Sequence, residues 1–223
     1  MKRFNELLHS NRENKFLPFT IALAFIILFE PFLDGIQTSF PIVNTLIMLS
    51  LVLGVYSIGY GRVMLSFVIV LVALTIVFSI LKDVLQMRIF GLLQYGCNIL
   101  FFGIADYRLI KFVAKSKNVT ANIIYGAICG YLLMGFIGAM LFDVLTTIAP
   151  NSLDFPYTDQ PGFHDFLYFS FVTLSTLGYG DVTPAAEVAQ SLSILLSVTG
   201  QMYLTVLVAM LVGKYLNDQN STK

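Results

Sequence analysis

The chain has 223 residues, of which 57% are hydrophobic and only 12% are charged, and its mean hydropathy is +0.81. An ordinary soluble domain has about 25% charged residues, so this chain has about half the charge that a water-facing surface needs. The 13 Lys and Arg residues balance the 13 Asp and Glu residues, which leaves no basic excess for the phosphates of a nucleic acid. The composition therefore excludes a soluble enzyme, a disordered regulator and a nucleic-acid-binding protein, and it indicates a polytopic membrane protein.

Six apolar segments are candidates for helices that cross a hydrocarbon core, which takes about 20 residues. They are residues 16–32, 40–58, 63–81, 89–105, 121–145 and 185–216. The first follows a basic leader, but no small-residue cleavage site comes after it, so we interpret it as a retained helix and not as a signal peptide. Cys97 and Cys129 lie inside apolar segments, where we expect neither a disulfide nor a metal site. The expected fold is therefore all-α, with six transmembrane helices.

The basic residues predict how these spans are oriented. With the N-terminus in the cytoplasm, eleven of the thirteen Lys and Arg residues fall on the cytoplasmic side, and only Lys82 and Arg88 fall outside. Both termini are then cytoplasmic, and we expect a multi-pass protein of the plasma (inner) membrane. The acidic residues show the opposite bias. Asp154, Asp165 and Asp181 are among those expected outside, where they would concentrate cations.

The segment between the last two spans, residues 146–184, is not a simple loop. After a turn-rich stretch it contains an apolar run of about twelve residues, from Phe163 to Leu174. Twelve residues extend about 18 Å as a helix, which is too short for a hydrocarbon core of about 30 Å. The run therefore predicts a re-entrant helix, which is tolerated only where protein or a water-filled cavity surrounds it.

Directly after this run comes the segment Thr176-Leu177-Gly178-Tyr179-Gly180-Asp181. Successive backbone carbonyls point to one side only if the backbone alternates between ordinary and left-handed conformations, and glycine reaches the left-handed region without steric cost. Gly178 and Gly180 have the spacing for this alternation. Leu177 and Tyr179 then point outward as a packed cuff, and Thr176 adds a hydroxyl oxygen at the inner end. The C-terminal dipole of the preceding helix favours a cation there. The alternative is a simple turn between a surface helix and the last span.

In this context the segment resembles the pore of the potassium-channel family, whose filter reads Thr-Val-Gly-Tyr-Gly and is usually followed by Asp. Leu177 stands in the Val position. The resemblance implies a selectivity filter that binds K⁺, with Asp181 at its outer mouth. The filter residues are Thr176, Leu177, Gly178, Tyr179 and Gly180, and the first four of them ligate the ion.

A single loop cannot surround an ion, so several chains must form the pore, and the resemblance makes their number four. The implied protein is a homotetrameric channel in a lipid bilayer, with K⁺ as its permeant ion and no cofactor. The chain then divides into a peripheral four-helix transmembrane domain, residues 1–117, and a pore domain, residues 118–223. The pore domain comprises an outer helix, the re-entrant pore helix, the filter and an inner helix.

Three residues are expected to support the filter. Tyr168 and Phe169 occupy the positions where many members of the family have two tryptophans. Tyr168 keeps a hydroxyl that can reach Asp181. Phe169 has no donor, so a hydrogen bond from that position to Tyr179 is absent. Thr173 or a neighbouring chain is a candidate substitute.

Two further residues have alternative interpretations. Gly200 lies 22 residues after Gly178, a spacing that in the family places a gating hinge in the inner helix. Close helix packing is the alternative role for a membrane glycine. His164 lies at the start of the re-entrant helix. Histidine is a common pH sensor in proteins, which is the alternative role here, but we interpret His164 as a structural residue at the membrane interface.

The fourth span, residues 89–105, contains no Lys or Arg, so a membrane potential finds almost no charge to move there. We therefore expect weak or absent voltage gating. Gln94 and Asn98 in the same span are expected to bond neighbouring helices. Two alternatives stay open at this point: a less selective Na⁺/K⁺ channel on the same scaffold, and a membrane transporter or enzyme. The sequence has no His-Glu-x-x-His motif and no half-to-half repeat typical of transporters.

Overall fold

The computed structural model describes residues 15–33, 47, 50, 53–54, 62–116, 119–158 and 160–221. Within these residues the fold consists of helices and one short antiparallel pair of strands. The elements in chain order are α2 (Leu17–Leu33), α4 (Arg62–Leu85), α5 (Arg88–Lys115), α6 (Ala121–Ile148), β1 (Leu153–Asp154), α7 (Phe163–Leu174), β2 (Thr183–Pro184) and α8 (Glu187–Ser221). The protein is therefore mostly helical, as the composition predicts.

Three helices of the described part of the chain are long and apolar enough to cross a membrane. They are Arg88–Lys115, Ala121–Ile148 and Glu187–Lys214. Two further apolar helices, Leu17–Phe32 and Ser66–Lys82, are shorter. These helices coincide with five of the predicted spans. The remaining predicted span, residues 40–58, lies outside the described residues except for four helical positions, so the arrangement with six spans stays a prediction.

The largest difference from the predicted boundaries concerns α5, which continues to Lys115 although the sequence predicts an end near residue 105. The ten additional residues contain no Gly or Pro that would end a helix. Leu109 and Val113, one turn apart, are buried, whereas Lys111 and Lys115 are exposed. The extension is thus an amphipathic helix with one apolar face, and hydropathy alone places its end too early because it stops at the first charges.

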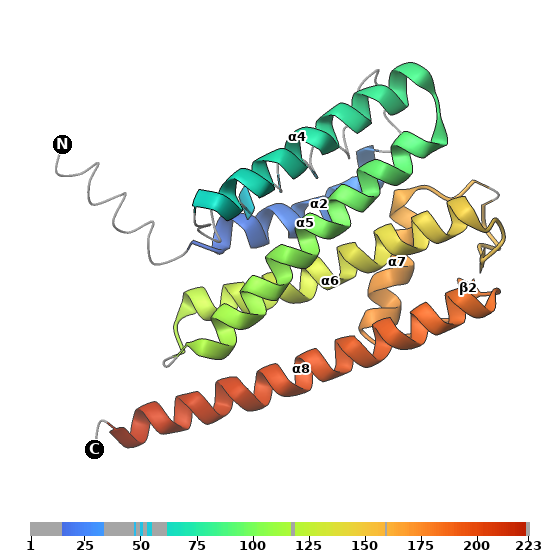
Figure 1. Cartoon of the computed structure of the whole chain (residues 1–223). Helices are drawn as coiled ribbons and strands as arrows, with labels where there is room; N and C mark the ends of the chain where they lie inside the picture. The colour runs from blue at the N-terminus through green and yellow to red at the C-terminus, as the bar shows by residue number, and fades with distance from the viewer. Residues whose placement is uncertain are drawn as a thin grey trace.

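Helix α6 is central to the fold, since it packs against α2, α5, α7 and α8 (Figure 1). Helices α4 and α5 form an antiparallel pair on one side of it. The pair is joined by a hydrogen bond in which Thr75 Oγ1 donates to Asn98 Oδ1 at 3.2 Å, so Asn98 does bond a neighbouring helix. On the other side, the short helix α7 crosses between α6 and the long helix α8 (Figure 1).

Candidate ion-binding site

Helix α7 spans Phe163–Leu174, the twelve residues that the sequence indicates. Its start is fixed by Asp165, whose carboxylate oxygen Oδ2 accepts a hydrogen bond of 2.8 Å from the backbone N–H of Gly162. An acidic residue in the first turn also interacts favourably with the helix dipole. The helix is therefore defined locally at its N-terminus, and its length leaves it far too short to cross a membrane.

A row of glycines on α6 allows α7 to approach closely. A methyl group on Gly135 would lie 2.3 Å from the ring of Phe171, and one on Gly138 would lie 2.3 Å from Ser170 Oγ. Ser170 Oγ uses this proximity to donate a hydrogen bond of 2.7 Å to the backbone oxygen of Gly135. Small residues that bring backbones together are typical of helix contacts in membranes. The close approach of α7 thus depends on the lack of a side chain at Gly135 and Gly138 of α6.

Phe169 supports α7 by packing. Its side chain is buried, and its ring meets the ring of Phe142 on α6 edge to face with centroids 4.8 Å apart. This geometry is a favourable one for aromatic pairs. Phe169 therefore anchors the helix that leads into the candidate filter, although it cannot donate a hydrogen bond.

The chain turns from α7 into the candidate filter through bonds to the last carbonyls of the helix. The N–H of Thr176 donates to the oxygen of Thr173 at 3.0 Å, and the N–H of Leu177 donates to the oxygen of Val172 at 3.0 Å. The N–H of Gly178 also points to the oxygen of Val172, at 3.3 Å. Among the described residues, Thr173 contacts the candidate filter through its backbone oxygen. The expectation from the sequence is different, because there the Thr173 side chain is a candidate hydrogen-bond donor to Tyr179.

The backbone of the segment alternates in the way that the glycines predict. Gly178 has φ +58° and Gly180 has φ +79°, while Leu177 and Tyr179 do not have positive φ. No heavy atom lies within 4 Å of the position that a Cβ would take at either glycine. Glycine is therefore required here for its conformation and not for space.

The alternation begins one step earlier than the sequence indicates, because Thr176 also has a positive φ of +58°. Such a value is unusual for a β-branched residue. Thr176 follows Ser175, the C-cap of α7, and thus occupies the position where glycine normally ends a helix. Three positions, each two residues apart, are consequently left-handed, which is the backbone pattern that turns successive carbonyls to one side.

The C-terminal end of the segment is held by a hydrogen bond between Tyr168 and Asp181. The Tyr168 hydroxyl donates to Asp181 Oδ2 at 2.5 Å. This bond raises the pKa of Tyr168 to about 12 and lowers the pKa of the Asp181 carboxyl below its usual value. Tyr168 therefore stays a donor and Asp181 an anion at neutral pH.

A two-stranded sheet reinforces the same end. Leu153 pairs with Pro184 and Asp154 with Thr183, so the chain before α7 is tied to the chain that follows the filter. Val182, between the filter and β2, is buried.

The N-terminal end of the segment contacts the middle of α8. A methyl group on Gly200 would lie 2.1 Å from the backbone oxygen of Leu174, so Gly200 is needed for close packing of α8 against the end of α7. Its role as a hinge stays a proposal. The next residue, Gln201, donates from Nε2 to Thr176 Oγ1 at 2.7 Å. This contact is not predicted above; its signal in the sequence is an amide side chain in a mostly apolar helix.

Leu177 and Tyr179 do not pack as a cuff within one chain. Their exposed fractions are 56% and 66%, which is high for apolar and aromatic residues. A cuff would need surfaces from outside this chain, and it stays a prediction.

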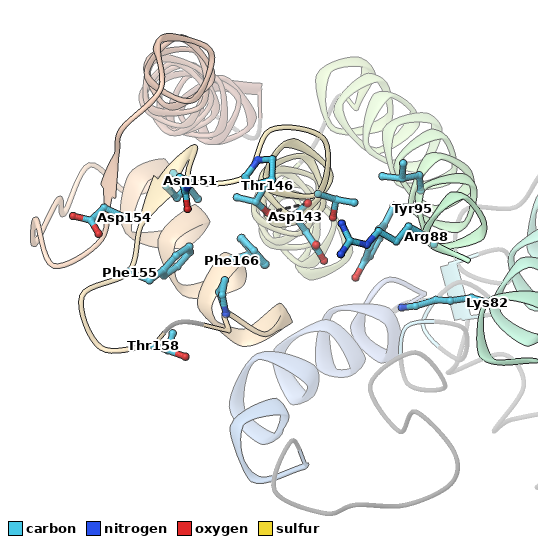
Figure 2. Close-up of a pocket in the computed structure, with 16 residues that line it drawn as sticks. Lys82, Arg88, Tyr95, Asp143, Thr146, Asn151, Asp154, Phe155, Thr158 and Phe166 are labelled. Carbon is cyan, nitrogen blue, oxygen red and sulfur yellow. Dashed lines mark hydrogen bonds between the residues drawn. The ribbon is translucent and has the colours of Figure 1, made fainter. Parts of the chain in front are cut away.

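A separate cavity of about 610 Å³ lies where α4, α5 and α6 meet the loop before α7 (Figure 2). Lys82 and Arg88, the two basic residues predicted on the outer side, line it together with Asp143 and Tyr95. None of residues 175–181 contributes to its lining. The cavity is thus distinct from the candidate filter.

His164 lies beside a fully buried acid. Its Nδ1 is 2.9 Å from Glu30 Oε2, and Glu30 belongs to α2, so the pair joins α2 to the start of α7. This contact agrees with a structural role for His164.

The comparisons with known proteins concern the same part of the chain. Residues 121–217 match the family model described as an ion channel, which covers α6, α7, the candidate filter and most of α8. The chain is also 39% identical over 67 residues to two-pore potassium channel 4 of Arabidopsis thaliana, an alignment that covers 30% of this chain and 24% of that protein. The match thus spans about a quarter of the length of this relative. No solved structure matches significantly. Residues 121–217 are therefore similar to ion channels.

Proposed function

We propose that this chain is one of four identical subunits of a potassium-selective channel, through which K⁺ crosses the membrane passively. The observation that supports this most is the alternation of left-handed backbone at Thr176, Gly178 and Gly180 directly after a twelve-residue helix. A dehydrated K⁺ needs oxygens in place of its water shell, and rings of backbone carbonyls provide them in channels. Thr176, Leu177, Gly178 and Tyr179 would provide these oxygens.

The exposed apolar surface of the pore half supports the tetramer. Leu177 and Tyr179 are open, and α8 exposes large apolar side chains along most of its length, including Ile194, Leu195 and Met202. In water such a surface would be unfavourable. Lipid can cover one side of α8, and neighbouring subunits can cover the rest. Closed rings are the usual arrangement of identical subunits.

The outer mouth would contain four copies of Asp181. Rings of carboxylates concentrate cations at channel entrances, and the bond from Tyr168 keeps each carboxylate ionised. This end of the molecule would face outward, with both termini in the cytoplasm and the protein in the plasma (inner) membrane. Lys82 and Arg88 lie toward the same outer side in this orientation.

The proposed channel is weakly gated by voltage or not at all. The basic residues of α5 are Arg88 at its first position and Arg108, Lys111 and Lys115 in its last turns, with none over residues 89–105. A membrane potential supplies about 2.3 kcal/mol per charge per 100 mV only for charge that moves through the field. Charges at both ends of a helix are better suited to fixing its orientation.

A less selective cation channel is the second candidate, and the position of Phe169 favours it. Phe169 packs against Phe142, and no side chain among the described residues donates to the Tyr179 hydroxyl. The filter would then be held less rigidly than one with donors at both positions. A membrane transporter or enzyme is the alternative of a different class.

Reversal potentials of purified protein in planar bilayers distinguish these functions. With K⁺ on one side at ten times the concentration on the other and Na⁺ replacing it, a K⁺-selective pore reverses near the K⁺ potential of about 59 mV. A reversal potential near zero in mixed K⁺ and Na⁺ would favour the less selective channel. Absence of passive flux, together with turnover of a substrate, would reject both channel functions.

A further inference from the structure

Helix α8 has an amide side chain at a place where an apolar one would be expected. Gln201 lies in the stretch that is long and apolar enough to cross a membrane, and polar side chains inside a membrane are costly unless they find a partner. The partner here is in the candidate filter, since Gln201 Nε2 donates to Thr176 Oγ1 at 2.7 Å.

This bond and a second one fix the orientation of the Thr176 hydroxyl. Thr176 Oγ1 donates its own hydrogen to the backbone oxygen of Ser175 at 2.7 Å. A hydroxyl group has one hydrogen and two lone pairs. The hydrogen is donated to the Ser175 oxygen, and one lone pair accepts the hydrogen bond from Gln201. A single lone pair therefore remains. An oxygen whose hydrogen is turned away in this manner presents only negative charge, which suits a cation.

The backbone conformation of Thr176 explains why several hydrogen bonds are needed to hold this residue. A β-branched residue with φ +58° is strained, and strained residues persist only where their surroundings over-determine them. Three hydrogen bonds hold Thr176. Its backbone N–H donates to the Thr173 oxygen, its hydroxyl donates to the Ser175 oxygen, and its hydroxyl oxygen accepts from Gln201 Nε2. Gln201 is the one member of this set that belongs to another helix.

The reach of Gln201 depends on the position of α8. The neighbouring Gly200 lets α8 approach so closely that a methyl group there would lie 2.1 Å from the Leu174 oxygen. A donor–acceptor distance of 2.7 Å passes the useful limit of about 3.5 Å after a displacement of about 1 Å. A small movement of α8 therefore suffices to break the bond.

We propose that Gln201 is a positioning residue that orients the Thr176 hydroxyl as the inner-end ligand of the filter, and that it thereby couples the position of α8 to ion affinity at that end. This inference rests on the function proposed above. It assigns Gln201 no direct contact with the ion.

The test is a double-mutant cycle with Ba²⁺ as the probe, because Ba²⁺ has nearly the size of K⁺ and twice its charge. Binding of Ba²⁺ to the purified full-length protein is measured by calorimetry, and block from the cytoplasmic side is measured in bilayers. Gln201→Leu should weaken both at least tenfold, since one hydrogen bond corresponds to about a fivefold change in an equilibrium constant and four copies surround the site. Calorimetry also reports on variants that do not conduct.

Thr199→Val is the matched control. Thr199 lies two residues away on the same helix. Among the described residues its hydroxyl bonds only within α8, to the oxygen of Leu195 at 2.7 Å. This variant should bind Ba²⁺ as the unaltered protein does. If Gln201→Leu does not assemble, Gln201→Asn replaces it, because the shorter amide keeps the polarity but cannot span the distance.

The background Thr176→Val gives the decisive comparison. There the hydroxyl is absent, so Gln201→Leu should cause no additional loss of Ba²⁺ affinity. An equal loss in both backgrounds, or unchanged affinity of Gln201→Leu in a conducting tetramer, would overturn the inference while the channel function stands. Failure of the unaltered protein to bind Ba²⁺ and to conduct K⁺ would instead refute the proposed function.

Discussion

Replacing Gly178 by alanine perturbs the candidate filter, and the free-energy cost of the replacement can be worked out from the structure. Within one chain, no heavy atom beyond the flanking residues lies within 4 Å of the added methyl group, so the cost within the chain comes from the backbone conformation. Left-handed backbone costs a residue with a Cβ roughly 1–2 kcal/mol, and Gly178 has this conformation with φ +58°. Four copies in the proposed tetramer would cost about 4–8 kcal/mol, and each 1.4 kcal/mol is about a tenfold change in population. The conducting conformation should therefore become at least about a thousand times rarer.

The assay is K⁺ efflux from liposomes that contain the purified protein, with assembly checked by size-exclusion chromatography. Gly178→Ala should assemble and conduct almost nothing. Gly213→Ala is the control, because its methyl group also meets open space but its φ is ordinary, and it should conduct normally. Normal efflux through Gly178→Ala would refute the assignment of this segment as a filter.

Two further variants test the ends of the segment. Gly200→Ala forces a methyl group against the Leu174 oxygen, so it should lower the thermal midpoint of the purified protein as well as the current; a change in gating with unaltered stability would favour the hinge role instead. Tyr168→Phe removes the donor that lowers the pKa of Asp181. That pKa should rise, so external acid should reduce the current at a higher pH than in the unaltered protein, and coincident titration curves would contradict this role for Tyr168.

Local chemistry predicts much of the structure of α7 and of the candidate filter that follows it. The apolar run from Phe163 to Leu174 has the same bounds as α7, because a proline- and glycine-rich loop precedes it and a polar segment follows. The conformations of Gly178 and Gly180 are predictable because glycine is the residue that adopts positive φ without cost.

Features that depend on tertiary contacts could not be predicted. Nothing local marks Thr176 as left-handed, since its φ depends on hydrogen bonds to α7 and α8. The sequence likewise cannot separate hinge from packing at Gly200, because both roles favour glycine. The pairing of Leu153 with Pro184 joins positions about thirty residues apart and leaves no periodic pattern in strands of two residues.

The central claim is that carbonyl oxygens from four chains surround a shared ion path. A cryo-electron microscopy map of the full-length protein in lipid nanodiscs and K⁺ tests it most directly. The account predicts a fourfold axis with ion density between the oxygens of residues 176–179, and with Leu177 and Tyr179 turned away from the axis. Monomers without a common axis, or oxygens of these residues facing protein or lipid, would contradict it.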